Sequence, residues 1–174
     1  MNLNKLLEVV KEAALKGGEE ILKIYETDFS VEEKDDKSPL TQADKNANAV
    51  IEEMLKETNI PILSEEGRGI DYSERKDWEY LWIVDPLDGT KEFVKRNGEF
   101  TVNIALIKNG VPVLGVIYVP VKQWLYYGHT EIGSFKIANG ELEKLPRQVL
   151  KDRYVAVGSR SHKSSETEAY FKEL

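Results

Sequence analysis

The sequence contains no cysteine and only two histidines, His129 and His162. Without cysteine the chain can form neither a disulfide nor a thiolate metal site, and a cysteine nucleophile is excluded. With so few histidines, a zinc site built on imidazole ligands is not expected. Any metal ion would therefore be held by oxygen ligands, which favours magnesium, calcium or manganese.

Long apolar runs and an excess of positive charge are also absent. The N-terminal stretch MNLNKLLEVVKEAALKGGEEILKIYE has acidic residues throughout and no apolar core, so we expect neither a signal peptide nor a membrane span, and a cytoplasmic location. The formal net charge of −7 argues against a broad surface for nucleic acid or anionic membranes. A small anionic ligand remains compatible, because a metal ion or a few donors can reverse the potential inside one pocket.

What is present is a globular composition with clear helical periodicity near the N-terminus. Hydrophobic residues make up 41% of the chain. Apolar residues at helical spacing predict an amphipathic helix over residues 3–25, in which Gly17 and Gly18 either break the helix or allow another backbone to approach. Residues 28–40 predict a mobile connection. The sequence TQAD then predicts a second helix with Thr41 as its N-cap.

From about residue 100 the apolar residues alternate, which predicts strands. The stretch FTVNIALIKNGVPVLGVIYVP is typical of a hairpin that turns at Asn109 and Gly110. WLYYGHT, GSFKIANGELEKL and YVAVGS predict further strands. Sequential strands joined by tight turns indicate an antiparallel meander, and the N-terminal helices can cover one of its faces. The predicted fold class is therefore α+β.

Three carboxylates follow predicted strands: Glu65 follows PILS, Asp85 follows LWIV, and Asp88 comes three residues later. Each motif alone is ambiguous, because Asp-Pro and Asp-Gly also mark turns and such acids can simply be solvated. Meeting at strand ends, the three acids would raise one another's pKa unless a cation compensates. Two magnesium ions about 3.5–4 Å apart would do so, and such sites suit phosphate hydrolysis. The N–H groups of Gly89 and Thr90 can face an anion.

Three motifs in this order, TQAD, SEE and DPLDGT, resemble those of the inositol monophosphatase superfamily. SPLTQAD, DGTKEFVKRNGEFTVNIALI and GSRSH narrow the resemblance to the CysQ-type 3′(2′),5′-bisphosphate nucleotidases, and it runs from about residue 5 to the end of the chain. It implies a layered, sugar-phosphatase-like fold. Residues 1–150 would form an N-terminal metal-binding α+β phosphatase domain, and residues 151–174 would start a second, incomplete domain.

The resemblance also implies roles for individual residues. The implied metal ligands are Glu65, Asp85, the backbone carbonyl of Leu87, and Asp88, with Asp85 bridging two ions. The implied catalytic residues are Asp44, Thr90 and Glu65, with Thr90 hydrogen-bonded to Asp44 and orienting the attacking water. The implied substrate-binding residues are Asp88, Gly89, Thr90, Ser159 and His162, the last two on the nucleotide side.

The activity implied by the resemblance is hydrolysis of the 3′-phosphate of adenosine 3′,5′-bisphosphate to AMP and phosphate. Two or three magnesium ions would serve as cofactors, with manganese as a substitute, and the reaction would clear a by-product of sulfate assimilation. The same chemistry on an inositol phosphate or fructose 1,6-bisphosphate stays open, as does a non-enzymatic metal- or nucleotide-binding remnant.

Family members extend further and carry a later W-D-x-A aspartate that completes the second metal site. We therefore expect little or no activity from this chain alone. We also expect an exposed apolar edge, and association either with a second copy or with a complementing C-terminal chain.

Overall fold

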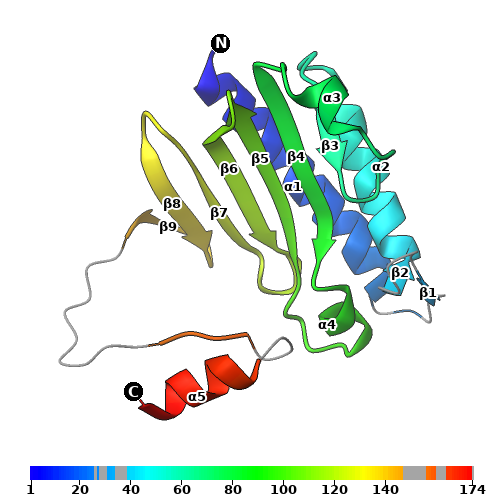
Figure 1. The fold of residues 1–174 in the computed structure, drawn as a ribbon, viewed down its shortest axis with the longest axis vertical. Coiled ribbons are helices and arrows are strands. Elements are labelled where there is room, and N and C mark those ends of the chain that lie inside the picture. Colours follow the sequence, from blue (N-terminus) through cyan, green and yellow to red (C-terminus); the bar gives the residue numbers. More distant parts are fainter. Residues whose placement is uncertain (26, 28–30, 34–38, 147–155, 160–163, 174) are drawn as a thin grey trace.

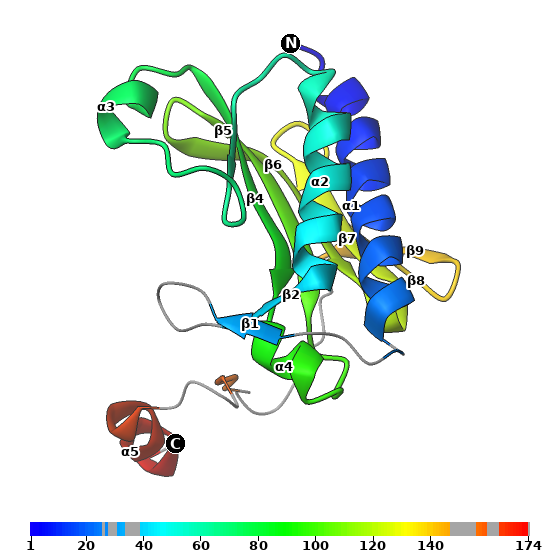
Figure 2. The ribbon, with the colours of Figure 1, turned by 90° about the vertical axis from the view of Figure 1, so that its right-hand side faces the viewer.

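The computed structural model describes residues 1–25, 27, 31–33, 39–146, 156–159 and 164–173. Two long helices, α1 and α2, lie against one face of a seven-stranded sheet (Figures 1 and 2). The helices are α1 (Leu3–Tyr25), α2 (Gln42–Lys56), α3 (Tyr72–Arg75), α4 (Thr90–Val94) and α5 (Ser165–Glu173), with a 3₁₀ turn at Pro120–Lys122. The strands are β1 (Val31–Glu33), β2 (Pro39–Thr41), β3 (Ile62–Ser64), β4 (Tyr80–Asp88), β5 (Thr101–Lys108), β6 (Val111–Val119), β7 (Trp124–His129), β8 (Gly133–Ala138) and β9 (Glu141–Leu145).

The first predicted helix is confirmed with the expected bounds, and its two glycines do not break it. A Cβ on Gly17 would lie 2.7 Å from Cδ1 of Ile51 on α2, and a Cβ on Gly18 would lie 2.4 Å from Cε1 of Tyr118 on β6. The glycines therefore let α1 pack closely on both its neighbouring helix and the sheet. Of the two alternatives left open by the sequence, a break is wrong and a close approach is found, but by the side chains of Ile51 and Tyr118 rather than by another backbone.

The meander is confirmed from β4 to β9, where each strand pairs antiparallel with the next. Asn109 and Gly110 both have positive φ, at 48° and 79°, as the predicted two-residue hairpin turn requires. Asn139 and Gly140 repeat this geometry between β8 and β9, at 53° and 79°. The strand β3 departs from the meander because it pairs parallel to β4, so the sheet is mixed.

Several local expectations are corrected by the structure. Residues 28–40, predicted to form a mobile connection, contain β1 and most of β2, and these strands pair antiparallel. The other residues of this range lie outside the described part of the chain. The four described residues of the predicted strand YVAVGS, 156–159, are not a strand. The predicted domain boundary at residue 150 also falls outside the described residues and stays a prediction.

The core lies between the helices and one face of the sheet. Trp82, Val84, Phe100, Val102 and Ile104 are among the buried residues that meet α1 and α2 there. None of the helices that the structure describes is both long enough and apolar enough to cross a bilayer.

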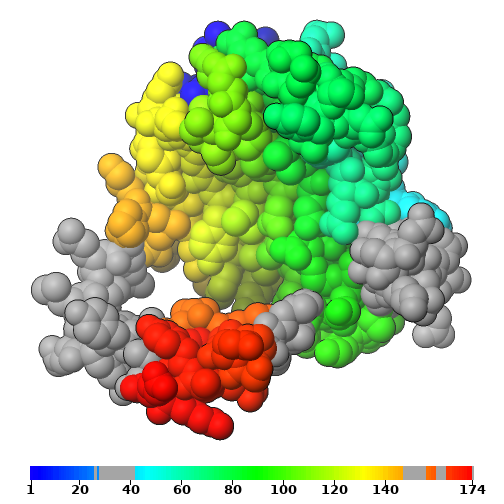
Figure 3. Space-filling view, viewed as in Figure 1, coloured from blue at the N-terminus to red at the C-terminus, as the bar shows by residue number. Residues whose placement is uncertain are grey.

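The opposite face of the sheet, called the open face below, is the one turned toward the viewer in Figure 3. Cross-strand partners place Asp85, Asn103, Ile117 and Tyr126 in one row on this face. A cavity of about 680 Å³ runs over it and includes all four residues in its lining. Ile117 is 47% exposed, although it sits in a central strand. The described part of the chain thus leaves an apolar surface in contact with water.

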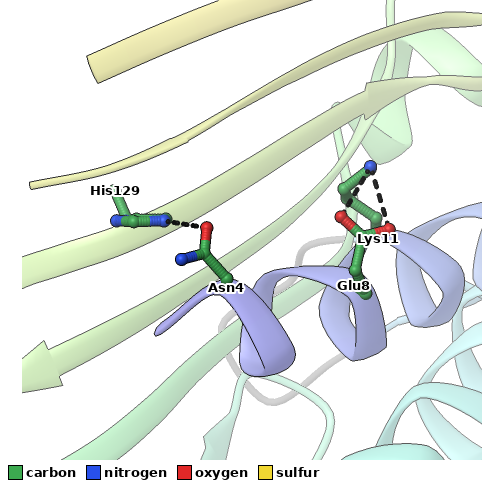
Figure 4. A network of polar contacts seen from close by, with 4 residues as sticks. All are labelled: Asn4, Glu8, Lys11 and His129. Carbon is green, nitrogen blue, oxygen red and sulfur yellow. Dashed lines mark hydrogen bonds and ion pairs between the residues drawn. The ribbon is translucent and has the colours of Figure 1, made fainter. Parts of the chain in front are cut away.

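The start of α1 is fixed to the sheet by a buried histidine (Figure 4). Nδ1 of His129, at the end of β7, accepts a hydrogen bond from the backbone N–H of Glu131 at 3.3 Å. Nε2 therefore carries the proton and donates to Oδ1 of Asn4 at 3.1 Å. One turn further on, Lys11 pairs with Glu8 at 3.1 Å. The bond between Asn4 and His129 joins α1 to the sheet, whereas the pair of Lys11 and Glu8 lies within the helix.

The buried indole of Trp82 gives a first stability prediction. Its Nε1–H donates to Oγ1 of Thr58 at 3.0 Å, and that hydroxyl donates to the carbonyl of Leu55 at 2.6 Å. Thr58→Val keeps the shape but leaves the indole N–H without an acceptor, so we expect a loss of about 1–3 kcal/mol in the free energy of unfolding. Thr58→Ser keeps the hydroxyl and is the matched control. Equal urea midpoints for the two variants would contradict this account.

Candidate active site

Parallel pairing of β3 and β4 brings two of the predicted site residues together. Ser64 pairs with Val84, and the next backbone N–H, that of Glu65, donates to the carbonyl of Val84 at 3.1 Å. The carboxyl ends of parallel strands lie at the same edge, so Glu65 comes to lie beside Asp85. A hydrogen bond joins the two side chains. The acids are separated by twenty residues in sequence but are neighbours in the fold.

Asp85 has a strongly perturbed environment. Its pKa is raised from the ordinary value of 3.8 to about 7, mainly by burial, and also by the negative charges of Glu65 and Asp88 and the hydrogen bond with Glu65. The backbone N–H of Leu87 acts in the opposite direction. Oδ1 of Asp85 is buried and has no hydrogen-bond partner among the described residues. A cation close to Asp85 would stabilise the ionised form of this carboxyl group.

Asp88 belongs to the same strand, since β4 continues through the predicted turn with an irregularity between Asp85 and Asp88. Its Oδ2 accepts a hydrogen bond from the amide of Asn103 at 3.1 Å, and Thr101 donates to the Oδ1 of Asn103 at 3.0 Å. Among the described residues, no three acidic or histidine side chains gather closely enough to enclose a metal ion. The acids form a pair, Glu65 and Asp85, with Asp88 close enough to influence its charge.

The turn after β4 has the shape that its sequence requires. Gly89 has φ of +91°, a conformation that disfavours side chains, and a Cβ there would lie 3.0 Å from the carbonyl oxygen of Glu99. Thr90 opens the short helix α4, and its hydroxyl donates to the carbonyl of Leu87 at 3.3 Å. The Leu87 carbonyl therefore points toward Thr90, while the Leu87 side chain is buried.

The other predicted residues are placed less completely. Asp44 is buried in the first turn of α2, with 2% of its surface exposed, and its hydrogen bond to Thr90 stays a prediction. Ser159 is exposed, and its approach to a nucleotide also stays a prediction. His162 lies outside the described residues.

Sequence reasoning missed the residues that support the acids. Asn103 holds Asp88, and its position in the alternation of β5, on the same face as Ala105, is a signal that a polar residue there faces the site. Ser64 donates to Oδ1 of Asn48 on α2 at 2.5 Å, and its own Oγ accepts from the backbone N–H of Glu66 at 3.3 Å. These bonds fix the turn that carries Glu65. No local sequence pattern predicts them.

These residues fit a divalent cation in their chemistry. The set offers carboxylates and a backbone carbonyl, the hard oxygen ligands that magnesium, calcium and manganese prefer. The unpartnered oxygen of Asp85 and its raised pKa show that negative charge is incompletely neutralised at this point. A cation there would remove both features.

Comparison with known proteins gives a consistent answer. The model of the inositol monophosphatase family matches residues 2–173. The chain is 43% identical over 173 residues to the 3′(2′),5′-bisphosphate nucleotidase CysQ of Salmonella typhimurium and 40% identical to that of Escherichia coli K12; each match covers 97% of this chain and 69% of the relative. The crystal structure of CysQ from Bacteroides thetaiotaomicron, a bacterial member of the inositol monophosphatase family, superposes with a TM-score of 0.86 at 48% identity, covering 97% of this chain and 68% of that one.

Proposed function

Because the chain belongs to the inositol monophosphatase family, we propose that it acts as a phosphatase of the bisphosphate nucleotidase type. The proposed substrate is adenosine 3′,5′-bisphosphate, and the products are AMP and phosphate. Two things support this: the identity to nucleotidases named CysQ, and the raised pKa of Asp85 between two other acids. The identity carries the proposal, and the acid pair with Asp88 nearby supports it, because such an arrangement suits a cation that binds phosphate. A cytoplasmic location is part of the same proposal.

Members of this family are metal-dependent phosphatases, and magnesium is the proposed ion here. Glu65, Asp85, the Leu87 carbonyl and Asp88 would hold it, with manganese as a substitute. When bound, such ions neutralise phosphate charge and lower the pKa of a coordinated water. Asn103 would keep Asp88 in place through the hydrogen bond described above.

The remaining chemistry falls to residues of the turn after β4 and to α2. The amides of Gly89 and Thr90 would hold the phosphate, which can approach closely because Gly89 has no side chain. The Thr90 hydroxyl would orient the attacking water, and Asp44 would accept the proton of that hydroxyl. Glu65 would assist in catalysis from the end of β3. Ser159 and His162 would contact the nucleotide.

A partner is the remaining part of the proposal. The chain spans 69% of the Salmonella relative, and the open face borders Asp85 through the cavity lined by Ile117 and Tyr126. We propose that the open face binds a polypeptide equivalent to the part of that relative which this chain does not match. Burying Ile117 and Tyr126 beside Asp85 would also exclude water from the acids. In a drier site the acids would interact more strongly with a bound cation.

The test is magnesium-dependent phosphate release, measured with the chain alone and with the unmatched part of the Salmonella relative added as a separate polypeptide. Substrates are adenosine 3′,5′-bisphosphate, an inositol monophosphate and fructose 1,6-bisphosphate. We expect turnover of the nucleotide in the mixture, and little or none by the chain alone. Ile117→Lys on the open face should prevent this complementation, whereas Val111→Lys at the exposed start of β6 should not.

Each other outcome decides against a part of the proposal. Turnover confined to the inositol phosphate or to fructose 1,6-bisphosphate would replace the proposed substrate. Binding of magnesium and nucleotide without turnover in the mixture would favour the non-enzymatic reading. Complementation that survives Ile117→Lys would remove the open face from the account.

A further inference from the structure

Arg96 lies just after α4, and its side chain reaches back to the end of α1. One guanidinium N–H group donates to the carbonyl of Tyr25, and another donates to the carbonyl of Thr27 at 2.6 Å. The guanidinium carbon also lies 5.7 Å from the centre of the Tyr25 ring. Tyr25 is the last residue of α1, so Arg96 binds a carbonyl that the helix end leaves without an intrahelical donor.

The backbone of Arg96 is in a conformation that glycine normally occupies. Its φ is +56°, and it follows Lys95, the C-cap of α4, where a left-handed residue is usually glycine. Its N–H donates to the carbonyl of Phe93 at 3.0 Å. A side chain in this region costs about 1 kcal/mol relative to glycine. The presence of arginine where glycine would be less strained indicates that the hydrogen bonds of its side chain offset this cost.

The loop that Arg96 holds also supports the turn at Gly89. The rings of Tyr25, Phe93 and Phe100 form a cluster with centroid separations of 5.0 to 5.2 Å. Phe93 donates its backbone N–H to the carbonyl of Gly89 at 2.9 Å. Gly89 in turn packs on the backbone of Glu99, as its missing Cβ shows. Displacing the loop would therefore move the residues against which the proposed phosphate-binding turn is packed.

The chain that leaves α1 leads to the other half of the proposed catalytic pair. It continues to the strands β1 and β2, and β2 runs directly into α2, whose first turn carries Asp44. The pair of strands lies beside α4 in both ribbon views, and β2 packs against α4 (Figures 1 and 2). Arg96 thus ties the end of α1 to the segment that follows Thr90, and α1 packs along α2, whose first turn carries Asp44.

We propose that Arg96 is a positioning residue for the reaction. By holding the end of α1 against the loop after α4, it sets the separation of Asp44 and Thr90 and the direction of the Gly89 and Thr90 amides. The inference rests on the proposed function, in which these groups orient water and bind phosphate. Arg96 acts through them and through the backbone that it ties down.

The experiment is a calorimetric titration of inorganic phosphate into the chain at saturating magnesium. Arg96→Lys keeps the charge but not the planar fork that spans two carbonyls, and Arg96→Gly removes the side chain while relieving the backbone. We expect each variant to lose about tenfold in phosphate affinity, equivalent to about 1.4 kcal/mol. Magnesium affinity, set by Glu65 and Asp85, should change little. Millimolar guanidinium, but not ammonium, should restore phosphate binding to Arg96→Gly.

Lys95→Ala is the matched control, because it removes a neighbouring exposed charge that is not tied to α1. It should leave phosphate affinity unchanged. Equal phosphate affinities for the wild type and both Arg96 variants would overturn the inference alone. A joint fall of thermal stability, magnesium affinity and phosphate affinity without guanidinium rescue would show a merely structural role and would also overturn it. If the wild type binds no phosphate either alone or with the added polypeptide, the proposed function fails and this inference fails with it.

Discussion

Replacing Asp85 with asparagine is expected to abolish magnesium binding by the chain and, in the absence of metal, to stabilise it. Asp85 lies between Glu65 and Asp88, with one buried oxygen that has no hydrogen-bond partner among the described residues. Asparagine has nearly the same shape but no charge. A cation would therefore lose its central ligand, while the metal-free chain would lose a like-charge repulsion.

The sign of the stability change follows from the pKa. In the folded chain the pKa of Asp85 is raised to about 7, against 3.8 ordinarily. Between these values the folded state binds more protons than the unfolded state, so the contribution of Asp85 to stability falls as the pH rises from about 4 to about 7. Above that window the metal-free wild type is at its least stable relative to Asp85→Asn. After allowance for solvent screening, the difference should be about 1–2 kcal/mol.

Thermal unfolding at pH 5 and pH 8, with and without magnesium, measures both effects. For a chain of this length, 1 kcal/mol corresponds to a shift of about 2–4 °C in Tm. Without metal, the variant should melt above the wild type at pH 8, and the gap should narrow at pH 5. Magnesium should raise the Tm of the wild type but not that of Asp85→Asn. Asp77→Asn, an exposed acid away from the site, is the control. Undiminished magnesium binding by Asp85→Asn would remove the basis for the proposed site.

Gly18→Ala should cause one of the largest losses of stability in the molecule. The new Cβ would lie 2.4 Å from the ring of Tyr118, which is 93% buried, and 3.3 Å from Pro120. Either the ring must leave its place on β6 or α1 must lift from the sheet. Alanine favours a helix by about 1 kcal/mol over glycine, so the expected net loss of about 1–3 kcal/mol runs against helix propensity.

Urea denaturation of Gly18→Ala and Gly115→Ala makes the comparison. Gly115 lies in β6, the strand that carries Tyr118, but a Cβ on Gly115 would meet no atom within 4 Å. It should be neutral or slightly stabilising. A Gly18→Ala variant at least as stable as the wild type would mean that the close approach of α1 to the sheet is not needed for packing.

The parts of the fold that depend on neighbours in sequence could be predicted. The bounds of α1 follow from its apolar period, and the hairpin turns at Asn109 and Asn139 follow from the glycine after each. The parallel pairing of β3 with β4 could not be predicted, because it joins segments separated by a loop with its own helix, α3. That pairing is what brings Glu65 to Asp85.

The candidate site shows the same division. The acids themselves stand out because they follow apolar strands. Their supporting residues do not, since Asn103 reaches Asp88 only through the register of β4 on β5. Arg96 is another such case, because its acceptors at Tyr25 and Thr27 lie about seventy residues earlier in the chain. Long-range contacts of this kind leave no periodic trace in a sequence.

The two outer strands of the sheet have a consequence for how the protein associates. The strand β3 is only three residues long, and β9 reads ELEKL, with a charged residue at three of its five positions. Short or charged borders discourage another chain from adding a strand in the plane of the sheet. The exposed apolar surface lies mainly on the open face, and the expected association stays a prediction. We therefore expect self-assembly of this protein into ribbon-like polymers to be disfavoured, and contacts with other polypeptides to form on the broad surface that carries Ile117.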